Sequence, residues 1–190
     1  MKLTKLFEEI LNEDNLKQEL SNGINIGNEF SIKYINPPSL DGGIGLYKDN
    51  KQVGFMEFES SNIPDLKNKF IRVSGGNNIG VKIDNNLKGI GIGSKFYKVV
   101  NSIIHKIYGF RLQSESEISQ SLDAYKLWKR FYENGDAEII YNEGQSPELI
   151  NGSPYYEWTN KIRFGDDIGV IYGSDSQKGM IYTGNIYALK

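Results

Sequence analysis

The chain has no cysteine and only one histidine, His105, among its 190 residues. The lack of cysteine excludes disulfide bridges, thiolate nucleophiles and zinc sites with cysteine ligands. A metal site built from several histidines of one chain is excluded as well, and a Ser-His-Asp triad would have to use His105. Because this residue lies within an apolar pattern of helical spacing, we expect a packed or surface histidine. We expect no metal cofactor.

Long apolar runs and an excess of positive charge are also missing. No run approaches the length that spans a membrane, and the N-terminal stretch carries acidic residues among its apolar ones, unlike a signal peptide. The formal net charge of -2 argues against a broad cationic surface for nucleic acid. With 38% hydrophobic and 24% charged residues, the composition is that of a soluble globular protein. We expect a cytoplasmic protein without a membrane or nucleic-acid partner, and its oligomeric state stays open.

The most informative stretch runs from Val81 to Tyr97. Val81 and Ile83 alternate with polar residues, which predicts a strand. Three glycines then occur at every second position: Gly89, Gly91 and Gly93. A helical apolar pattern follows from Ser94 to about Tyr108. Glycine readily adopts a positive φ, and the first amides of a helix can hold a phosphate group. The stretch therefore predicts a phosphate-binding loop between a strand and a helix.

Two familiar nucleotide-binding motifs do not fit this loop. A P-loop requires Gly-Lys-Ser/Thr after a longer gap, whereas Ser94 precedes Lys95 here. A dinucleotide fingerprint requires G-x-G-x-x-G within a βαβ unit, whereas this chain has G-x-G-x-G after residues that predict antiparallel hairpins. A glycine-rich turn that only caps a helix is a further alternative.

The sequence K-G-I-G-I-G at positions 88–93 resembles the acetyl-CoA loop of the GNAT N-acetyltransferase superfamily, whose pattern is Gln/Arg-x-x-Gly-x-Gly/Ala. Lys88 replaces the usual Gln or Arg, which keeps a hydrogen-bond donor and changes its geometry. The residues L-Q-S-E and L-W farther along the chain also resemble small GNAT-like proteins encoded by phages.

A second motif of this family, Asn-x-x-Ala-x-x-Leu-Tyr, is partly matched by residues 121–128. The match holds at Ala124 and Leu127 and fails at Ser121 and Trp128. The order and separation of this motif and the glycine loop agree with the family pattern.

The order of the expected elements also resembles the GNAT fold. That fold is α+β, with a mixed, mostly antiparallel central sheet flanked by helices. We expect helices near 3–11, 16–20, 94–108 and 122–132, and strands near 30–34, 43–48, 52–60, 70–73, 79–83, 109–112 and 137–141. The resemblance covers residues 25–142. Residues 1–24 are expected to form an N-terminal amphipathic helical segment, and residues 143–190 a β-rich C-terminal extension.

The resemblance implies an N-acetyltransferase that moves an acetyl group from acetyl-CoA directly to an amine acceptor, either a small molecule or a protein. The implied acetyl-CoA-binding residues are Val81, Ile83, Lys88, Gly89, Ile90, Gly91, Ile92, Gly93 and Ser94.

The implied reaction needs a base for the acceptor ammonium and an acid for the leaving thiolate. Glu57 is the candidate base and shares a strand face with Glu59, with a solvated carboxylate as the alternative. Trp128 stands where the family often has a tyrosine that protonates the leaving thiolate. An indole N–H is a hydrogen-bond donor but does not give up its proton, so Trp128 cannot act as this general acid. Tyr132, one helical turn later, is the candidate substitute, with a core tyrosine as the alternative.

The same substitution leaves a second function open. The chain would then be a catalytically impaired GNAT-like binding or inhibitor module, of the kind that phages encode. A nucleotide-binding fold of another type is a third alternative, which the glycine spacing disfavours.

Overall fold

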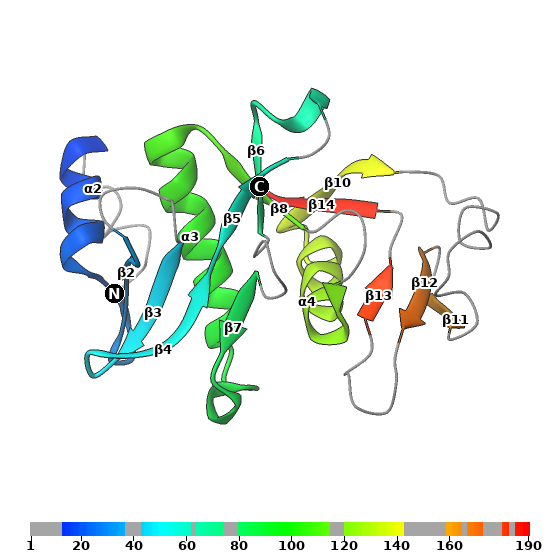
Figure 1. Cartoon of the computed structure of the whole chain (residues 1–190), viewed down its shortest axis with the longest axis horizontal. Coiled ribbons are helices and arrows are strands. Elements are labelled where there is room, and N and C mark those ends of the chain that lie inside the picture. Colours follow the sequence, from blue (N-terminus) through cyan, green and yellow to red (C-terminus); the bar gives the residue numbers. More distant parts are fainter. Residues whose placement is uncertain are drawn as a thin grey trace. The chain divides into compact units, whose positions relative to one another are not determined.

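A computed structural model describes residues 13–36, 43–61, 64–73, 80–114, 120–142, 159–164, 167–172, 180–182 and 185–190 (Figure 1). This part of the chain is a mixed α+β structure with antiparallel sheets. Its α-helices are α2 (Glu13–Asn22), α3 (Ile92–Tyr108) and α4 (Leu122–Glu133). The chain divides into two compact units, Met1–Leu112 and Gln113–Lys190. The α+β class expected from the sequence is confirmed.

The first unit contains a five-stranded antiparallel sheet in the order β1-β2-β3-β4-β7. Its strands are β1 (Ile24–Gly27), β2 (Phe30–Tyr34), β3 (Ile44–Lys48), β4 (Lys51–Met56) and β7 (Val81–Ile83). The β3–β4 hairpin turns at Asp49 and Asn50, whose φ angles are 50° and 62°. Two positive φ angles at the centre of a two-residue turn match the right-handed twist of the strands. This hairpin was expected, whereas the strand β1 was not.

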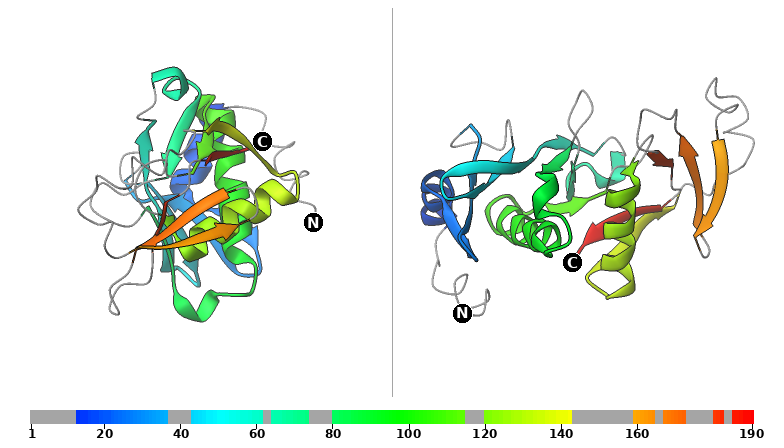
Figure 2. Two further views of the ribbon diagram at one scale, coloured as in Figure 1. Left: turned by 90° about the vertical axis from the view of Figure 1, so that its right-hand side faces the viewer. Right: turned by 90° about the horizontal axis from the view of Figure 1, so that it is seen from below.

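Two helices pack on one side of this sheet. Figure 2 shows α2 and α3 on the same side of the strands, and α2 contacts both β2 and α3. Leu16 and Leu20 of α2 are fully buried, because their four-residue spacing places them on one helix face. Tyr34 and Tyr108 join β2 to the end of α3 through hydroxyl groups 2.7 Å apart. Burial and this contact raise the pKa of Tyr34.

A second set of strands completes the first unit. The strand β5 (Phe58–Ser60) pairs antiparallel with β6 (Phe70–Val73), and a short 3-10 helix, η1 (Pro64–Leu66), lies between them in sequence. The amide of Arg111, at the start of β8 (Arg111–Gln113), donates to the carbonyl of Lys69 over 3.0 Å. The buried side chain of Asn101 in α3 accepts a hydrogen bond from the amide of Leu112 over 2.8 Å. Asn101 therefore attaches α3 to β8.

The second unit holds α4 and two groups of strands. The strand β10 (Ala137–Asn142) pairs antiparallel with β14 (Asn185–Leu189), and Ala188 of β14 pairs with Gln113. A four-stranded sheet has the order β11-β12-β13-β9. Its strands are β11 (Thr159–Phe164), β12 (Asp167–Tyr172), β13 (Met180–Tyr182) and β9 (Gln120–Ser121). The last strand, β14, thus lies between β10 and the end of β8.

Most expected elements are present, with small shifts at their ends. The helix expected from Ser94 begins at Ile92, and the strand expected near 109–112 covers Arg111–Gln113. The helix expected near 3–11 lies outside the described residues. The two units do not follow the expected division at 24/25 and 142/143. Those domain boundaries remain a prediction.

Replacing Asn101 with leucine should destabilise the protein. The variant leaves the buried Leu112 amide without its acceptor, which typically costs about 1–3 kcal/mol. Urea unfolding should show this loss as a lower midpoint. Ser102→Ala serves as the control, since that exposed hydroxyl only bonds the Lys98 carbonyl of its own helix. Equal midpoints for Asn101→Leu and the wild type would contradict the anchoring role.

Candidate functional site

The strand β7 has one edge that no other strand covers in the described structure. It is the outermost strand of its sheet and pairs only with β4. Asp84 donates its amide to the carbonyl of Val53 over 2.9 Å, and Gly80 accepts from the amide of Glu57 over 2.8 Å. Residues of an antiparallel strand bond to the partner strand alternately. The positions between these two, Val81 and Ile83, therefore point their backbone N–H and C=O groups away from β4.

The close pairing of β7 with β4 depends on Gly54. A Cβ atom at this position would lie 2.7 Å from the carbonyl oxygen of Lys82 and 3.3 Å from Ile83 Cγ1. A real Cβ does not tolerate the first distance, so only glycine lets β7 lie at this spacing. A glycine inside a strand often marks such a close approach, and this was the signal that the sequence offered for Gly54.

The glycine loop follows β7 through one turn of 3-10 helix, η2 (Asn85–Leu87). Leu87 is buried and holds this turn in the fold. Gly89 and Gly91 have φ angles of 83° and 81°, in the left-handed region that favours glycine. No atom lies within 4 Å of the Cβ position of either glycine. Backbone conformation and not crowding therefore requires glycine here.

The helix α3 begins directly after this loop. Gly91 is its N-cap residue, and the first intrahelical hydrogen bond runs from the Lys95 amide to the Gly91 carbonyl over 3.2 Å. The amides of residues 92–94 therefore precede the helical hydrogen-bond pattern. No side chain caps this end, and its first turn contains no acidic residue. The positive end of the helix dipole is thus not neutralised by the helix itself and can bind an anionic ligand.

The start of α3 and β7 are in contact. The Cβ position of Gly93 lies 3.4 Å from Ile83 Cδ1, which is an ordinary van der Waals distance. The loop therefore places the outward-facing backbone of β7 close to the first amides of the helix. The exposed side chain of Ile90, at 62%, lies between the two left-handed glycines. The structure thus brings together the loop residues and both strand residues that the sequence selected.

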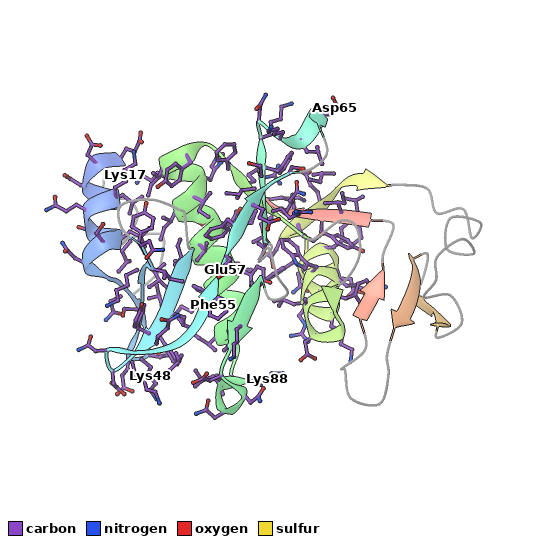
Figure 3. All side chains as sticks on the ribbon, in the orientation of Figure 1. Lys17, Lys48, Phe55, Glu57, Asp65 and Lys88 are labelled. Carbon is purple, nitrogen blue, oxygen red and sulfur yellow. The ribbon has the colours of Figure 1, made fainter. Side chains whose placement is uncertain are left out.

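Two lysines flank the loop and differ in position. Lys88 directly precedes the first left-handed glycine, and Figure 3 shows it on the loop beyond β7. Lys95 lies in the first turn of α3, with its Nζ atom 3.1 Å from the Cβ position of Gly27. Its ammonium group is therefore next to the β1–β2 hairpin.

Glu57 lies at the junction between β4 and β5 and belongs to neither strand. Figure 3 shows it close to Phe55. Its side chain is half-buried, and no ion pair of its carboxylate occurs among the described residues. A Cβ at Gly43, where φ is 90°, would lie 3.1 Å from the Glu57 Cα and 2.1 Å from the Met56 carbonyl oxygen. Glycine at position 43 thus allows the start of β3 to lie against Glu57.

The neighbouring carboxylate, that of Glu59, differs from Glu57 because it has an ion-pair partner. Glu59 forms an ion pair with Arg72, which lies directly opposite it in β6. The sequence predicts that both glutamates lie on one continuous strand. In the structure this strand is interrupted at Glu57. Of the two carboxylates, Glu57 is the one available to a ligand.

The second catalytic candidate belongs to the other unit. Tyr132 in α4 is 45% exposed, and its ring centroid lies 5.7 Å from that of Tyr187. The alternative of a core tyrosine is therefore wrong. Trp128 is 2% exposed and packs edge-to-face on Phe131, with centroids 5.9 Å apart. Glu57 and Tyr132 are each placed only within their own unit.

Metal-binding clusters and membrane-spanning helices are absent from the described residues. There, no group of three or more histidine, cysteine or carboxylate side chains is placed to hold a metal ion. In the same part of the chain, no helix is both long and apolar enough to cross a membrane. His105 lies in the last turn of α3 with an exposed side chain.

No protein-family model matches the chain, and no curated protein matches it. Among solved structures, it is similar to the crystal structure of "a putative phosphinothricin N-acetyltransferase". The identity is 14%, the TM-score is 0.40, and the match covers 98% of this chain and 85% of the other. A similarity this remote carries no functional argument.

Replacing Gly54 with alanine should displace β7. The new methyl group would meet the Lys82 carbonyl oxygen, and such overpacking costs about 1–3 kcal/mol. We expect a lower unfolding midpoint and faster hydrogen exchange of the Asp84 amide, which bonds β4. The matched control is Gly93→Ala, whose Cβ makes only an ordinary contact and improves helix propensity. If both variants were equally stable, the close approach at Gly54 would not matter.

Proposed function

We propose that the protein is an acetyl-CoA-dependent N-acetyltransferase that acts on an amine acceptor. One observation carries this proposal: the outward-facing edge of β7 leads through a left-handed glycine loop into the uncapped N-terminus of α3. Such an arrangement offers hydrogen bonds along one line and an anion site at its end.

The residues of the first unit fit the two parts of acetyl-CoA. The pantetheine arm is an extended chain with two amide groups, and Val81 and Ile83 offer donors and acceptors to such a chain as a neighbouring strand would. The diphosphate is anionic, and the amides of residues 92–94 face no acidic residue in the first turn. Gly89 and Gly91 leave the backbone open to a ligand, because they carry no side chain and no atom lies within 4 Å of their Cβ positions. Lys88 adds positive charge at the start of the loop.

Acetyl-CoA, when bound, supplies an activated acyl group. The chain contributes orientation, because an extended ligand held along β7 has few positions for its reactive end. In this proposal Glu57 accepts a proton from the acceptor ammonium, since its half-buried carboxylate has no ion-pair partner among the residues described. Tyr132 is exposed and is proposed to donate a proton to the leaving thiolate.

The alternative function is a GNAT-like binding or inhibitor module that has lost catalysis. The observation that favours it is the burial of Trp128, which occupies the tyrosine position of the family motif and packs on Phe131 as a core residue. A module of this kind would still bind acetyl-CoA or CoA without transferring the acetyl group.

Binding should depend on the N-terminal end of α3 and not on its C-terminal end. Gly91→Glu places a carboxylate where the diphosphate is proposed to bind, so calorimetry should show at least a 100-fold loss of acetyl-CoA affinity. Gly109→Glu is the matched control, because Gly109 is a left-handed, exposed glycine at the other end of the same helix. Both variants bear the cost of a non-glycine residue at positive φ, about 1–2 kcal/mol. Equal affinities in the two variants, or no binding to the wild type, would refute the proposed site.

Catalysis should depend on the carboxylate of Glu57. Gln has the same size and cannot accept the proton, so Glu57→Gln should lower kcat by about 100-fold. The dissociation constant for acetyl-CoA should not change. Glu29→Gln is the control, since Glu29 lies in an exposed turn of the same unit. A wild type that binds acetyl-CoA but acetylates no amine would favour the binding module, and an active Glu57→Gln variant would remove Glu57 from the mechanism.

A further inference from the structure

One face of the five-stranded sheet points away from α3. Ile83 contacts the start of α3, so the preceding residue of β7, Lys82, faces the other side. Lys82 belongs to a row of directly opposed residues on four neighbouring strands: Lys33, Gly45, Phe55 and Lys82. Directly opposed residues share a face of the sheet. Because α2 and α3 lie together on one side of the strands (Figure 2), neither of these helices covers the row.

The ring of Tyr47 lies over this row. Tyr47 comes two positions after Gly45 on β3 and therefore shares its face. A Cβ atom at Gly45 would lie 2.6 Å from Tyr47 Cε2 and 3.0 Å from the hydroxyl oxygen, so the ring requires glycine beneath it. The Nζ atom of Lys33 lies 4.2 Å from the centroid of the same ring. Since the face of an aromatic ring attracts a cation, Tyr47 holds the ammonium group of Lys33 over β3.

The ammonium group of Lys33 has no anionic partner among the residues that the structure describes. Lys33 is half-buried, and neither an ion pair nor a hydrogen bond joins its Nζ atom to another side chain there. Lys82, at the end of the row, differs because it is exposed and shares its face with the opposite charge of Asp84. An aromatic ring attracts an ammonium group but lacks the oxygen acceptors that its three N–H donors can use. A carboxylate would supply them through charge-assisted hydrogen bonds.

Glu57 lies on the same face as Lys33. It comes two positions after Phe55, and its amide bonds the Gly80 carbonyl of the chain that leads into β7, so the alternation of β4 extends to it. Figure 3 shows Phe55 and Glu57 close together. Neighbouring strands and alternate residues are spaced so that the Cα atoms of Lys33 and Glu57 are about 12 Å apart. The charged ends are closer, roughly 8–10 Å by the same spacings, because Lys33 extends over β3 toward β4.

We propose that the amine acceptor carries a carboxylate, which binds the ammonium group of Lys33 while the amine lies at Glu57. This inference rests on the proposed acetyltransferase function and makes Lys33 a specificity-determining residue. Both charges belong to the first unit and lie within reach of one small molecule. Phe55, which is in the same row as Lys33 and next to Glu57 on this face, offers apolar surface to the part of the acceptor between its two charged groups.

The separation of the two charges selects the length of the acceptor. In an α-amino acid the amine and the carboxylate share one carbon, so such a molecule cannot reach Glu57 and Lys33 together. An ω-amino acid with several methylene groups can, and ε-aminohexanoate is the probe of choice. A free α-amino acid should therefore gain nothing from Lys33.

Three matched acceptors test the inference: ε-aminohexanoate, hexylamine and hexamethylenediamine. They share a primary amine on a six-carbon chain, and the other end carries a carboxylate, no charge or an ammonium group. The wild type should show the highest kcat/KM for ε-aminohexanoate. In Lys33→Met, the ratio of kcat/KM for ε-aminohexanoate to that for hexylamine should fall by about 10–100-fold, because a charge-assisted hydrogen bond is lost. In Lys33→Glu, hexamethylenediamine should become the best of the three.

Lys48→Met is the matched control. Lys48 also lies over an aromatic ring of this sheet, with its Nζ atom 5.7 Å from the centroid of Phe30, but its ammonium group is paired with Glu29. This variant removes the same charge and should leave the ratio unchanged. Lys33→Arg keeps the positive charge and should retain the preference for ε-aminohexanoate.

NMR of the lysine side chains gives a readout that does not depend on activity. The signals of Lys33, identified by their loss in Lys33→Met, should shift when ε-aminohexanoate is added and not when hexylamine is added. A wild type that binds acetyl-CoA but prefers hexylamine, treats the three acceptors alike or acetylates none of them would overturn the inference. An unchanged ratio in Lys33→Met would overturn it as well. If the wild type binds no acetyl-CoA, the proposed function fails, and the NMR titration alone then decides for or against Lys33.

Discussion

The hydrogen-bond register between β4 and β7 is the constraint on which the candidate site depends. Because Asp84 and Gly80 bond to β4, the residues between them face the opposite side. A shift of one residue would turn Val81 and Ile83 toward β4 and present Lys82 at the open edge in their place. Gly54 fixes the spacing of the two strands, since any side chain there would meet the Lys82 carbonyl. Gly54, which lies in the neighbouring strand, thus helps to determine where the backbone groups of β7 point.

The loop and the helix add a different kind of interaction to this edge. Strand groups offer directional hydrogen bonds, whereas the start of α3 offers the partial positive charge of aligned peptide dipoles. Such a charge is useful to an anion only where nothing else neutralises it. A side-chain cap, or a glutamate in the first turn, would stabilise α3 and occupy its amides. Gly91 provides no such cap, and the first turn of α3 contains no acidic residue. The isolated helix is less stable for this reason, but its first amides stay available to an anion.

Much of this arrangement could be predicted from the sequence. The alternation at Val81 and Ile83, the spacing of the glycines and the apolar pattern of α3 are local features, and each formed the expected element. The interruption at Glu57 could not be predicted, because it depends on how β4 and β5 pair with two different strands. Burial was also difficult to infer: Tyr132 and Trp128 lie on one helix, yet the tyrosine is exposed and the tryptophan is enclosed. The burial of Gln113 could not be predicted either, because the residue opposite it, Ala188 of β14, is far away in sequence.

The position of β14 has a consequence for the speed of folding. Its register pairs Ala137 with Leu189, which is 52 positions later because 189 − 137 = 52. Joining residues so far apart costs loop-closure entropy before any contact repays it, and domains rich in such pairs fold slowly. Before β14 has paired during folding, β10 and the end of β8 lack the strand that lies between them in the folded protein. The second unit therefore passes through a period in which unpaired strand edges are open to association with other chains.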